Sequence, residues 1–215
     1  MMIAARNAFL MGGAKLPYDA EVEYLESTGT QYIDTGVIFT PTSAVAMRIA
    51  YTHISTSDTD AQHNGFTKGS DSGNFRIIFG QNSEHNHIYA AALTKYITAD
   101  TALHTFAVDL VSRTARIDTS SSSISGSLTG GFTRSFYIFA RNTDGVANLF
   151  CHERVYAATF LENGVLVRDF IPVRVGSGSS AVGCLYDRAN PTGGPLGNGL
   201  YPNAGTGAFV IGPDK

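Results

Sequence analysis

From Tyr24 onward, short runs rich in Val, Ile, Thr, Tyr and Phe alternate with clusters of Gly, Asn, Asp and Ser. Apolar runs separated by turn residues in this way are typical of successive β-strands. No long stretch repeats its apolar residues with the 3.6-residue period of a helix. The pattern predicts strands at residues 31–37, 44–53, 74–79, 87–93, 103–110, 114–118 and 135–140.

The clearest single unit is the stretch 149–171, in which Asn163 and Gly164 join two apolar-rich runs. This dipeptide readily adopts the positive φ angles of a two-residue hairpin turn. The first run is apolar on both of its faces, so we expect it inside a sheet that is covered on both sides. Because many strands follow one another without helices between them, the chain is expected to be all-β, an antiparallel β-sandwich of the jelly-roll type.

Two segments between the expected strands are predicted to be loops. The serine-rich stretch 119–127 is short enough for an ordinary loop within one domain. Residues 190–199 combine Pro, Gly and Asn, which predicts a long surface loop before the last short strands. Neither segment is expected to divide the chain into two domains.

Composition agrees with a turn-rich β protein. Charged residues make up 15% of the chain, against roughly 25% in an ordinary soluble domain, and glycine contributes 23 of 215 residues. The net charge of −3 leaves no basic stripe for phosphate contacts, which argues against a nucleic-acid partner. No run reaches the roughly 18 apolar residues of a membrane-spanning helix, so we expect no membrane span.

The two cysteines, Cys151 and Cys184, allow at most one disulfide bridge. A chain of this size does not need a covalent cross-link to be stable, so two inert thiols are favoured and a disulfide is the alternative. The cysteines also lack the C-x-x-C spacing that is typical of a zinc site.

The N-terminal residues 1–18 are predicted to form an arm or anchor, followed by the jelly-roll domain at 19–215. The apolar run 8–11 is shorter than the ~7 to 15 residues of a signal-peptide core. Phe9, Leu10 and Met11 need another surface to cover them. We therefore expect the arm to dock on a neighbouring subunit or on another protein.

Four motifs bracket residues 20 to 215. They read YLESTGTQYIDTG at 24–36, LVRDFIPV at 166–173, GCLYDR at 183–188 and NAGTGAF at 203–209. In this order they resemble the opening and the end of concanavalin A-like, laminin-G-type domains, which occur in phage and prophage structural proteins and in surface proteins of gut bacteria. The middle of the chain, from about residue 40 to 134, resembles that family only in character.

This resemblance implies a concanavalin A-like jelly roll and a protein displayed on a particle or a cell surface. Symmetric assembly, such as a trimer, is implied by the resemblance alone. Charged residues inside strands more often serve packing than chemistry, so Arg168, Asp169 and Asp187 are expected to be paired or hydrogen-bonded near the surface of the sandwich.

One acidic segment carries a catalytic alternative. Glu21, Glu23 and Glu26 resemble the E-x-D-x-x-E strand of jelly-roll glycoside hydrolases, and two carboxylates on one face suit a retaining glycosidase. Glu26 falls on the opposite face by alternation, and the segment lies at the edge of the domain. The sequence therefore favours a protein that is not an enzyme, with no catalytic residues.

Metal binding has two weak candidates. His85 and His87 form a His-x-His pair, with His63 upstream, but spacing identifies no third ligand. Asp58, Asp60 and Asp71 could donate oxygens to Ca²⁺, although they do not follow the spacing of a defined calcium loop. We therefore predict neither a metal site nor a cofactor, and Ca²⁺ stays the alternative.

Glycan binding is the natural recognition function for such a fold. Without tryptophan, a platform for sugar rings must rely on Tyr, Phe or His. Because loops on a rigid sandwich tend to carry recognition, the variable middle segment supplies the ligand-binding candidates. These are His63, Asn64, Phe66, Arg76, His85, His87 and Tyr89.

The function expected from the sequence is a phage-type virion structural or adhesion protein, in which the arm attaches a displayed lectin-like jelly roll to other virion proteins. Glycans are candidate ligands of the jelly roll. A bacterial surface or secreted carbohydrate-binding module is the alternative, and a glycoside hydrolase of the same fold is the third reading.

Overall fold

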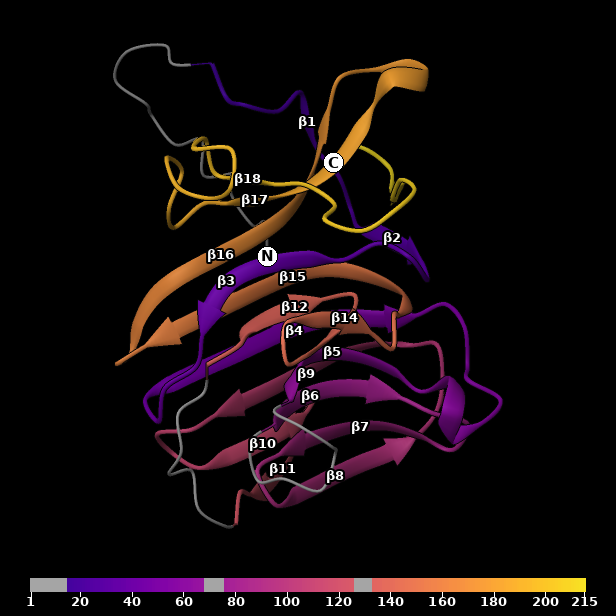
Figure 1. Cartoon of the computed structure of the whole chain (residues 1–215), viewed down its shortest axis with the longest axis vertical. Helices are drawn as coiled ribbons and strands as arrows, with labels where there is room; N and C mark the ends of the chain where they lie inside the picture. Colours follow the sequence, from indigo (N-terminus) through magenta and orange to yellow (C-terminus); the bar gives the residue numbers. More distant parts are fainter. Residues whose placement is uncertain (1–14, 68–75, 126–132) are drawn as a thin grey trace, which may run out of the picture.

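Two β-sheets that face each other build the protein (Figure 1). The structure is a computed structural model that describes residues 15–67, 76–125 and 133–215. The architecture is the expected antiparallel β-sandwich of the jelly-roll class. Within the described ranges the helical segments are the 3₁₀ turns Asp58–Asp60 and Gly178–Ser180, and none of them could span a bilayer.

The larger sheet contains eleven strands. They are β1 (Ala20–Glu21), β2 (Leu25–Thr28), β4 (Ser43–Tyr51), β9 (Leu103–Asp109), β10 (Thr114–Ile117), β11 (Ser120–Ser123), β15 (His152–Glu162), β16 (Val165–Val175), β17 (Val182–Asp187), β18 (Leu200–Tyr201) and β19 (Val210–Ile211). The main path runs β11-β10-β9-β4-β15-β16-β17-β18. The three remaining strands attach to it, β1 to β16, β2 to β15 and β19 to β2.

The smaller sheet contains eight strands. They are β3 (Ile33–Ile38), β5 (Gln62–Thr67), β6 (Arg76–Gln81), β7 (His85–Ala90), β8 (Leu93–Thr98), β12 (Ser135–Ile138), β13 (Arg141–Thr143) and β14 (Val146–Asn148). The main path runs β14-β13-β5-β6-β7-β8, and β12 links β5 to β3. Strand β13 runs parallel to β5, whereas the other described pairs are antiparallel.

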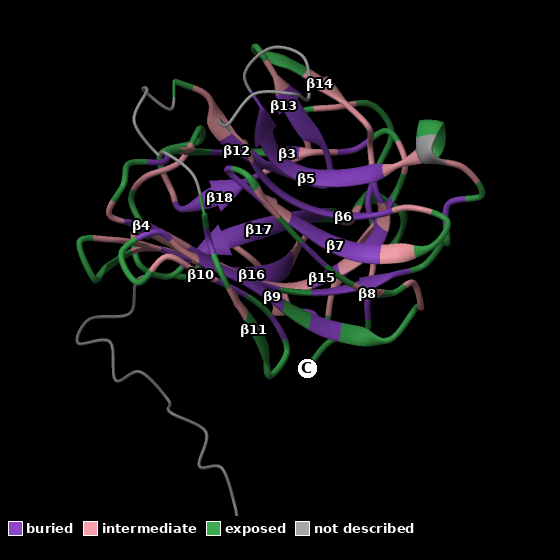
Figure 2. Ribbon diagram, turned by 90° about the horizontal axis from the view of Figure 1, so that it is seen from below, coloured by how far each residue is buried: buried purple, intermediate pink, exposed green. Residues whose placement is uncertain are grey.

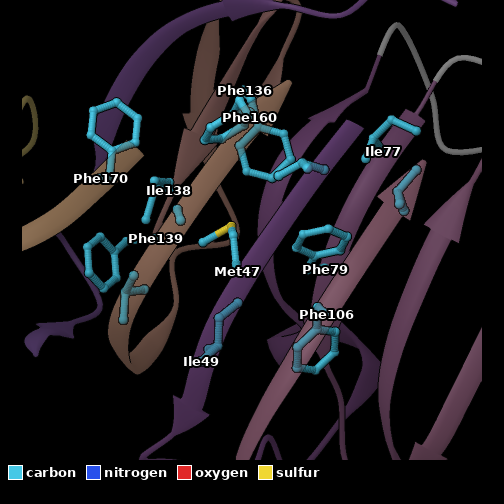
Figure 3. Packing of buried hydrophobic residues seen from close by; sticks show 14 of the residues in the cluster. Met47, Ile49, Ile77, Phe79, Phe106, Phe136, Ile138, Phe139, Phe160 and Phe170 are labelled. Atoms are coloured by element: carbon cyan, nitrogen blue, oxygen red, sulfur yellow. The ribbon is translucent and has the colours of Figure 1, made fainter. Parts of the chain in front are cut away.

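Phenylalanine dominates the core between the sheets (Figure 3). The ring of Phe39 lies 5.4 Å from that of Phe66, and the rings of Phe136 and Phe160 lie 5.3 Å apart. Aromatic pairs at such distances contribute more than the area that they bury. Buried residues follow the strands of both sheets, while exposed residues concentrate in the connections (Figure 2).

The predicted hairpin is confirmed. Strands β15 and β16 are joined by Asn163 and Gly164, whose φ angles of 51° and 75° are the positive values that a tight hairpin turn needs. Strand β15 pairs with β4 along one edge and with β2 and β16 along the other, so it lies inside the large sheet. Buried and half-buried residues alternate along it, so only one of its faces is fully covered and the expectation of cover on both faces is wrong.

Two sequence predictions were wrong about strand boundaries. The predicted strand 87–93 is instead the end of β7 and the start of β8, because the chain turns at Ala91, where φ is 51°. The expected loop at 119–127 contains β11, which pairs with β10 through its backbone and so needs no apolar side chains. Residues 126 and 127 of that stretch lie outside the described part of the chain.

The structure shows the state of the two cysteines and the partners of the charged motif residues. Cys151 and Cys184 are buried free thiols, so the disulfide alternative is wrong. Arg168 Nε lies 3.5 Å from Asp187 Oδ2, and Asp187 is fully buried. Asp169 pairs with Arg188 at 2.8 Å. These motif charges are paired as expected, but Asp187 is buried in the sandwich and not near its surface.

The opening and closing motifs interlock. Thr30 Oγ1 donates to the carbonyl of Thr206, and Gln31 Nε2 donates to the carbonyl of Ala208. A Cβ on Gly205 would lie 2.2 Å from the Thr30 carbonyl oxygen, so the backbones meet where only glycine fits. The motifs that carry the family resemblance therefore close the sandwich structurally.

The N-terminal arm falls largely outside the described residues, which begin at Lys15. Tyr18, which the sequence assigns to the arm, packs against Tyr186 of β17 with ring centroids 4.9 Å apart. The folded domain therefore includes at least this last residue of the predicted arm.

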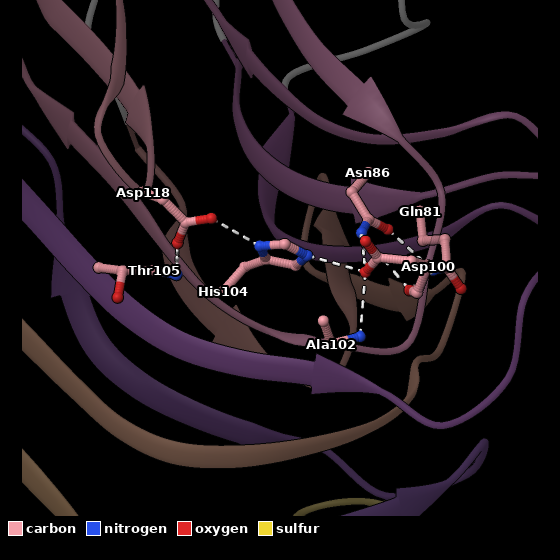
Figure 4. Close-up of polar contacts among 7 residues, drawn as sticks. All are labelled: Gln81, Asn86, Asp100, Ala102, His104, Thr105 and Asp118. Carbon is pink, nitrogen blue, oxygen red and sulfur yellow. Dashed lines mark hydrogen bonds and ion pairs between the residues drawn. The ribbon is translucent and has the colours of Figure 1, made fainter.

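A histidine clamp ties the two sheets together at one end (Figure 4). His104 of β9 contacts Asp118 Oδ2 through Nδ1 at 2.7 Å and Asp100 Oδ1 through Nε2 at 2.8 Å. The carbonyl of Asp100 accepts hydrogen bonds from Gln81 and Asn86 of the smaller sheet. Burial alone would lower the pKa of His104, but the two aspartates outweigh it and raise that pKa.

Candidate functional site

A pocket on the outer face of the smaller sheet brings together four of the seven ligand-binding candidates. Alternation places His63 of β5, His87 and Tyr89 of β7, and Arg76 of β6 on the face that points away from the other sheet. These four side chains line one pocket of about 300 Å³. Its other lining residues are Ala61, Ile78, Asn82 and Leu149. We call this cavity the β5–β7 pocket.

Two buried histidines form its centre. His63 Nε2 lies 3.2 Å from His87 Nε2, and the two rings meet edge to face across β6. Gly80 lies between them in register, and a Cβ there would lie 2.5 Å from the His63 ring and 2.6 Å from the His87 ring. Glycine at position 80 therefore makes room for the histidine pair.

Both histidines of this pair are neutral near pH 7. Burial lowers the pKa of His63 well below its usual value, and the nearby His87, Arg141 and Arg76 lower it further. Burial likewise lowers the pKa of His87, to about 4. In a neutral pair at this distance, one ring donates its Nε2 proton to the lone pair of the other. The pair is thus held in complementary tautomers.

Arg76 and Tyr89 form one wall of the pocket. The Arg76 guanidinium carbon lies 4.2 Å from the centre of the Tyr89 ring, which is a cation–π geometry. Tyr89 also lies 4.5 Å from the His87 ring, centre to centre. Arg141 of β13 is a further cation of this face, and its Nε donates to Thr143 and Asn148. The wall therefore combines aromatic surface with hydrogen-bond donors.

The structure places Asn64 and Phe66 on the opposite, inner face of β5. Asn64 Nδ2 donates to Glu153 Oε2 at 3.0 Å, and its Oδ1 accepts the backbone N–H of Phe139 at 2.6 Å. Phe66 is part of the aromatic core. Neither side chain reaches the β5–β7 pocket, because adjacent residues of a strand point to opposite faces.

His85, the seventh candidate, lies on the same outer face but outside the pocket. Its ring centroid is 4.3 Å from that of Tyr96 on β8. The sequence did not single out Tyr96, Asn82 or Arg141. The alternation in His85, His87 and Tyr89 is the signal that puts these three on one face, but their partners come from strands distant in sequence.

The expectation that recognition residues would lie on loops is wrong for this set. All seven lie on β5, β6 or β7. Strand β5 was missed because all six of its residues are buried while several of them are polar, so no apolar alternation marks it. The candidate site is a sheet face and not a loop cluster.

The catalytic candidates and the calcium candidates lie away from this pocket. Glu21 is part of the two-residue β1, and Glu26 forms an ion pair with Arg154 at 2.7 Å. Asp60 accepts a hydrogen bond from Ser57 at 2.8 Å. Asp71 and the side chain of Asp58 lie outside the described part of the structure. In the part of the chain that the structure describes, no three His, Cys, Asp or Glu residues come together as metal ligands.

Comparisons with known proteins add little to this picture. No family model matches the chain, and no curated protein matches it at a significant level. Among solved structures, a point mutant of the NanB sialidase from Streptococcus pneumoniae is similar with a TM-score of 0.43 and 9% sequence identity. The match covers 90% of this chain and 39% of that chain, so the chain spans about two fifths of that protein. A likeness of this size says nothing about the activity of this chain, whose fold is that of an all-β sandwich.

Proposed function

We propose that the chain is a non-enzymatic recognition module displayed on a virion, and that it binds a glycan in the β5–β7 pocket. The observation that carries the proposal is the convergence of His63, Arg76, His87 and Tyr89 on one outward-facing pocket. A volume of about 300 Å³ is at the small end of ligand pockets and suits a single sugar ring.

The chemistry of these side chains is suited to a sugar. The Arg76 guanidinium carries several hydrogen-bond donors that suit sugar hydroxyl groups, while the two histidines use their Nε2 atoms on each other. Tyr89 adds aromatic surface to the pocket wall, with Arg76 lying over its ring. Because the His63–His87 pair is already held in place by packing, a ligand would lose little affinity to ordering these side chains.

The virion part of the proposal rests on the sequence resemblance. The motifs at 24–36, 166–173, 183–188 and 203–209 resemble domains of phage structural proteins, and residues 1–18 would serve as the attachment arm. A bacterial surface or secreted carbohydrate-binding module with the same pocket is the alternative.

We expect His87→Ala to reduce the affinity for any glycan hit by at least tenfold. The substitution removes the ring that pairs with His63 and lines the pocket. Arg76→Ala should reduce the same hits. A printed glycan array, followed by calorimetry of the strongest hit, measures both effects. Arg48→Ala is the matched control, since Arg48 is exposed on the other sheet.

Two results would contradict the glycan proposal. The first is an array without hits for the unmodified chain, which would favour a purely structural role. The second is a hit that all three variants bind equally well, since its site would then lie elsewhere. Hydrolysis of a hit that stops in a Glu23→Gln variant would favour the glycosidase reading.

The virion assignment has its own test. Mass spectrometry of phage particles purified from the source of the gene should recover peptides of this chain, and neighbouring genes should encode capsid or tail proteins. A chain that lacks residues 1–16 should be absent from the particles, because the arm would make the attachment. Recovery only from the cell-surface or secreted fraction would instead support the alternative.

A further inference from the structure

Tyr96 is an exposed aromatic side chain beside the β5–β7 pocket. It is 59% exposed, although β8 is otherwise packed against the core through Leu93 and Ile97. In the register of the sheet Tyr96 lies directly opposite His87, so both side chains point to the same outer face. The pocket and the Tyr96 ring are therefore neighbours on adjacent strands.

His85 supports the Tyr96 ring from the side. The two ring centroids are 4.3 Å apart, with an angle of 54° between the planes. His85 is diagonal to Tyr96 across β7 and β8, because it pairs with Thr98. Glu84 lies next to this pair, with Oε2 3.9 Å from His85 Nδ1. The result is an aromatic surface with a carboxylate at its rim.

We propose that Tyr96 and His85 form a second sugar-binding subsite, so that the ligand is a linear oligosaccharide of at least two rings. This inference rests on the proposed glycan function of the β5–β7 pocket. One ring would occupy the pocket, and the next would stack on Tyr96.

The layout of the face supports a chain rather than a single ring. Tyr89, His87 and His85 follow one another at every second position of β7, which spaces the first and last by about 13 Å along the strand. A single pyranose is shorter than that. Tyr96 widens the strip by one strand spacing, about 4.8 Å. A one-ring ligand in the pocket would leave the surface formed by His85 and Tyr96 uncovered.

Calorimetry with sugars of increasing length tests the inference. The probes are the strongest glycan-array hit and its truncations to one, two and three rings that keep the same terminal sugar. For the unmodified chain we expect affinity to rise about fivefold to tenfold from one ring to two, which is the size of an aromatic stacking contribution. Tyr96→Ala should abolish this rise and leave the one-ring affinity unchanged.

Two further variants keep the interpretation clear. Tyr96→Phe retains the ring and should retain the rise, whereas loss of the rise in Tyr96→Phe would point to the hydroxyl group instead of stacking. Tyr156→Ala, on the other sheet, should behave like the unmodified chain. Melting temperatures within a few degrees of each other would show that the variants are folded.

The outcomes separate the two proposals. If one-ring binding depends on His87 but two rings bind no better than one, or bind equally well to Tyr96→Ala, the second subsite is refuted and the glycan pocket stands. If no saccharide of any length binds, the glycan function fails and the subsite fails with it.

Discussion

Replacing Gly65 by alanine is expected to lower the free energy of unfolding by about 2–6 kcal/mol, which sums overpacking and backbone strain. Gly65 is a buried residue of β5 with a φ of +125°, a value that residues with a Cβ rarely adopt. An added Cβ would lie 2.0 Å from the carbonyl oxygen of Ile77 on β6. The obstacle is backbone, so no side-chain rotation can relieve it.

A second glycine separates the two contributions. Gly164 also has a positive φ, of 75°, but nothing lies within 4 Å of its Cβ position. Gly164→Ala should therefore cost only the conformational part, about 1–2 kcal/mol. Chemical denaturation of both variants measures the difference. Equal losses in the two variants would mean that β5 and β6 do not approach as closely at Gly65 as the structure has them.

The strands that the sequence could predict are those with an unambiguous local signal. The β15–β16 hairpin has two apolar runs and an Asn-Gly turn, and both features are read within some twenty neighbouring residues. Strand β11 gives the opposite case, because four serines carry no apolar alternation. It forms because β10 offers a partner edge, and Lys95 Nζ donates to Ser120 and Ser122 from the other sheet.

The site was predictable in part for the same reason. Alternation along β7 brings His85, His87 and Tyr89 to one face, and this can be read from the sequence. That His63 faces His87 across Gly80 depends on the pairing of β5 with β6 and of β6 with β7, which is a long-range property. Asn64 was chosen as a candidate because of its residue type. Its side chain points inward and contacts Glu153, which depends on the fold and cannot be read from the local sequence.

Glu153 is a buried acid whose titration should make the stability of the fold depend on pH. It is fully buried on β15, and its Oε2 accepts a hydrogen bond from Asn64. Burial raises the pKa of Glu153 to about 8, although the hydrogen bonds from Asn64 and Cys151 act in the opposite direction. The folded protein therefore keeps a proton on this carboxyl at neutral pH.

Glu162, at the end of the same strand, has a pKa that is shifted in the opposite direction. Its carboxylate accepts hydrogen bonds from the hydroxyls of Thr40, Thr42 and Ser43. Burial alone would raise the pKa of Glu162, but these hydroxyls lower it overall. Glu162 therefore stabilises the fold when it is ionised, and that contribution is lost as the pH falls through its folded pKa.

Glu153→Gln is expected to remove a pH dependence of up to about 5 kcal/mol in the free energy of unfolding. Between the unfolded pKa of 4.5 and the folded value of about 8, the folded state holds one proton that the unfolded state has lost. The contribution of Glu153 to stability must then fall as the pH rises through this window, by about 1.4 kcal/mol per pH unit, and level off above it. Glutamine keeps the shape and the acceptor for Asn64 but has no proton to lose. The stability of the variant relative to the unmodified chain should therefore increase from pH 5 to pH 8.

Urea unfolding at several pH values measures the difference in stability between the two chains, in which the contributions of the histidines cancel. Glu162→Gln should instead be less stable than the unmodified chain at neutral pH, with the gap closing in acid. Parallel pH profiles for Glu153→Gln and the unmodified chain would mean that Glu153 is ionised in the fold, with a partner for its charge.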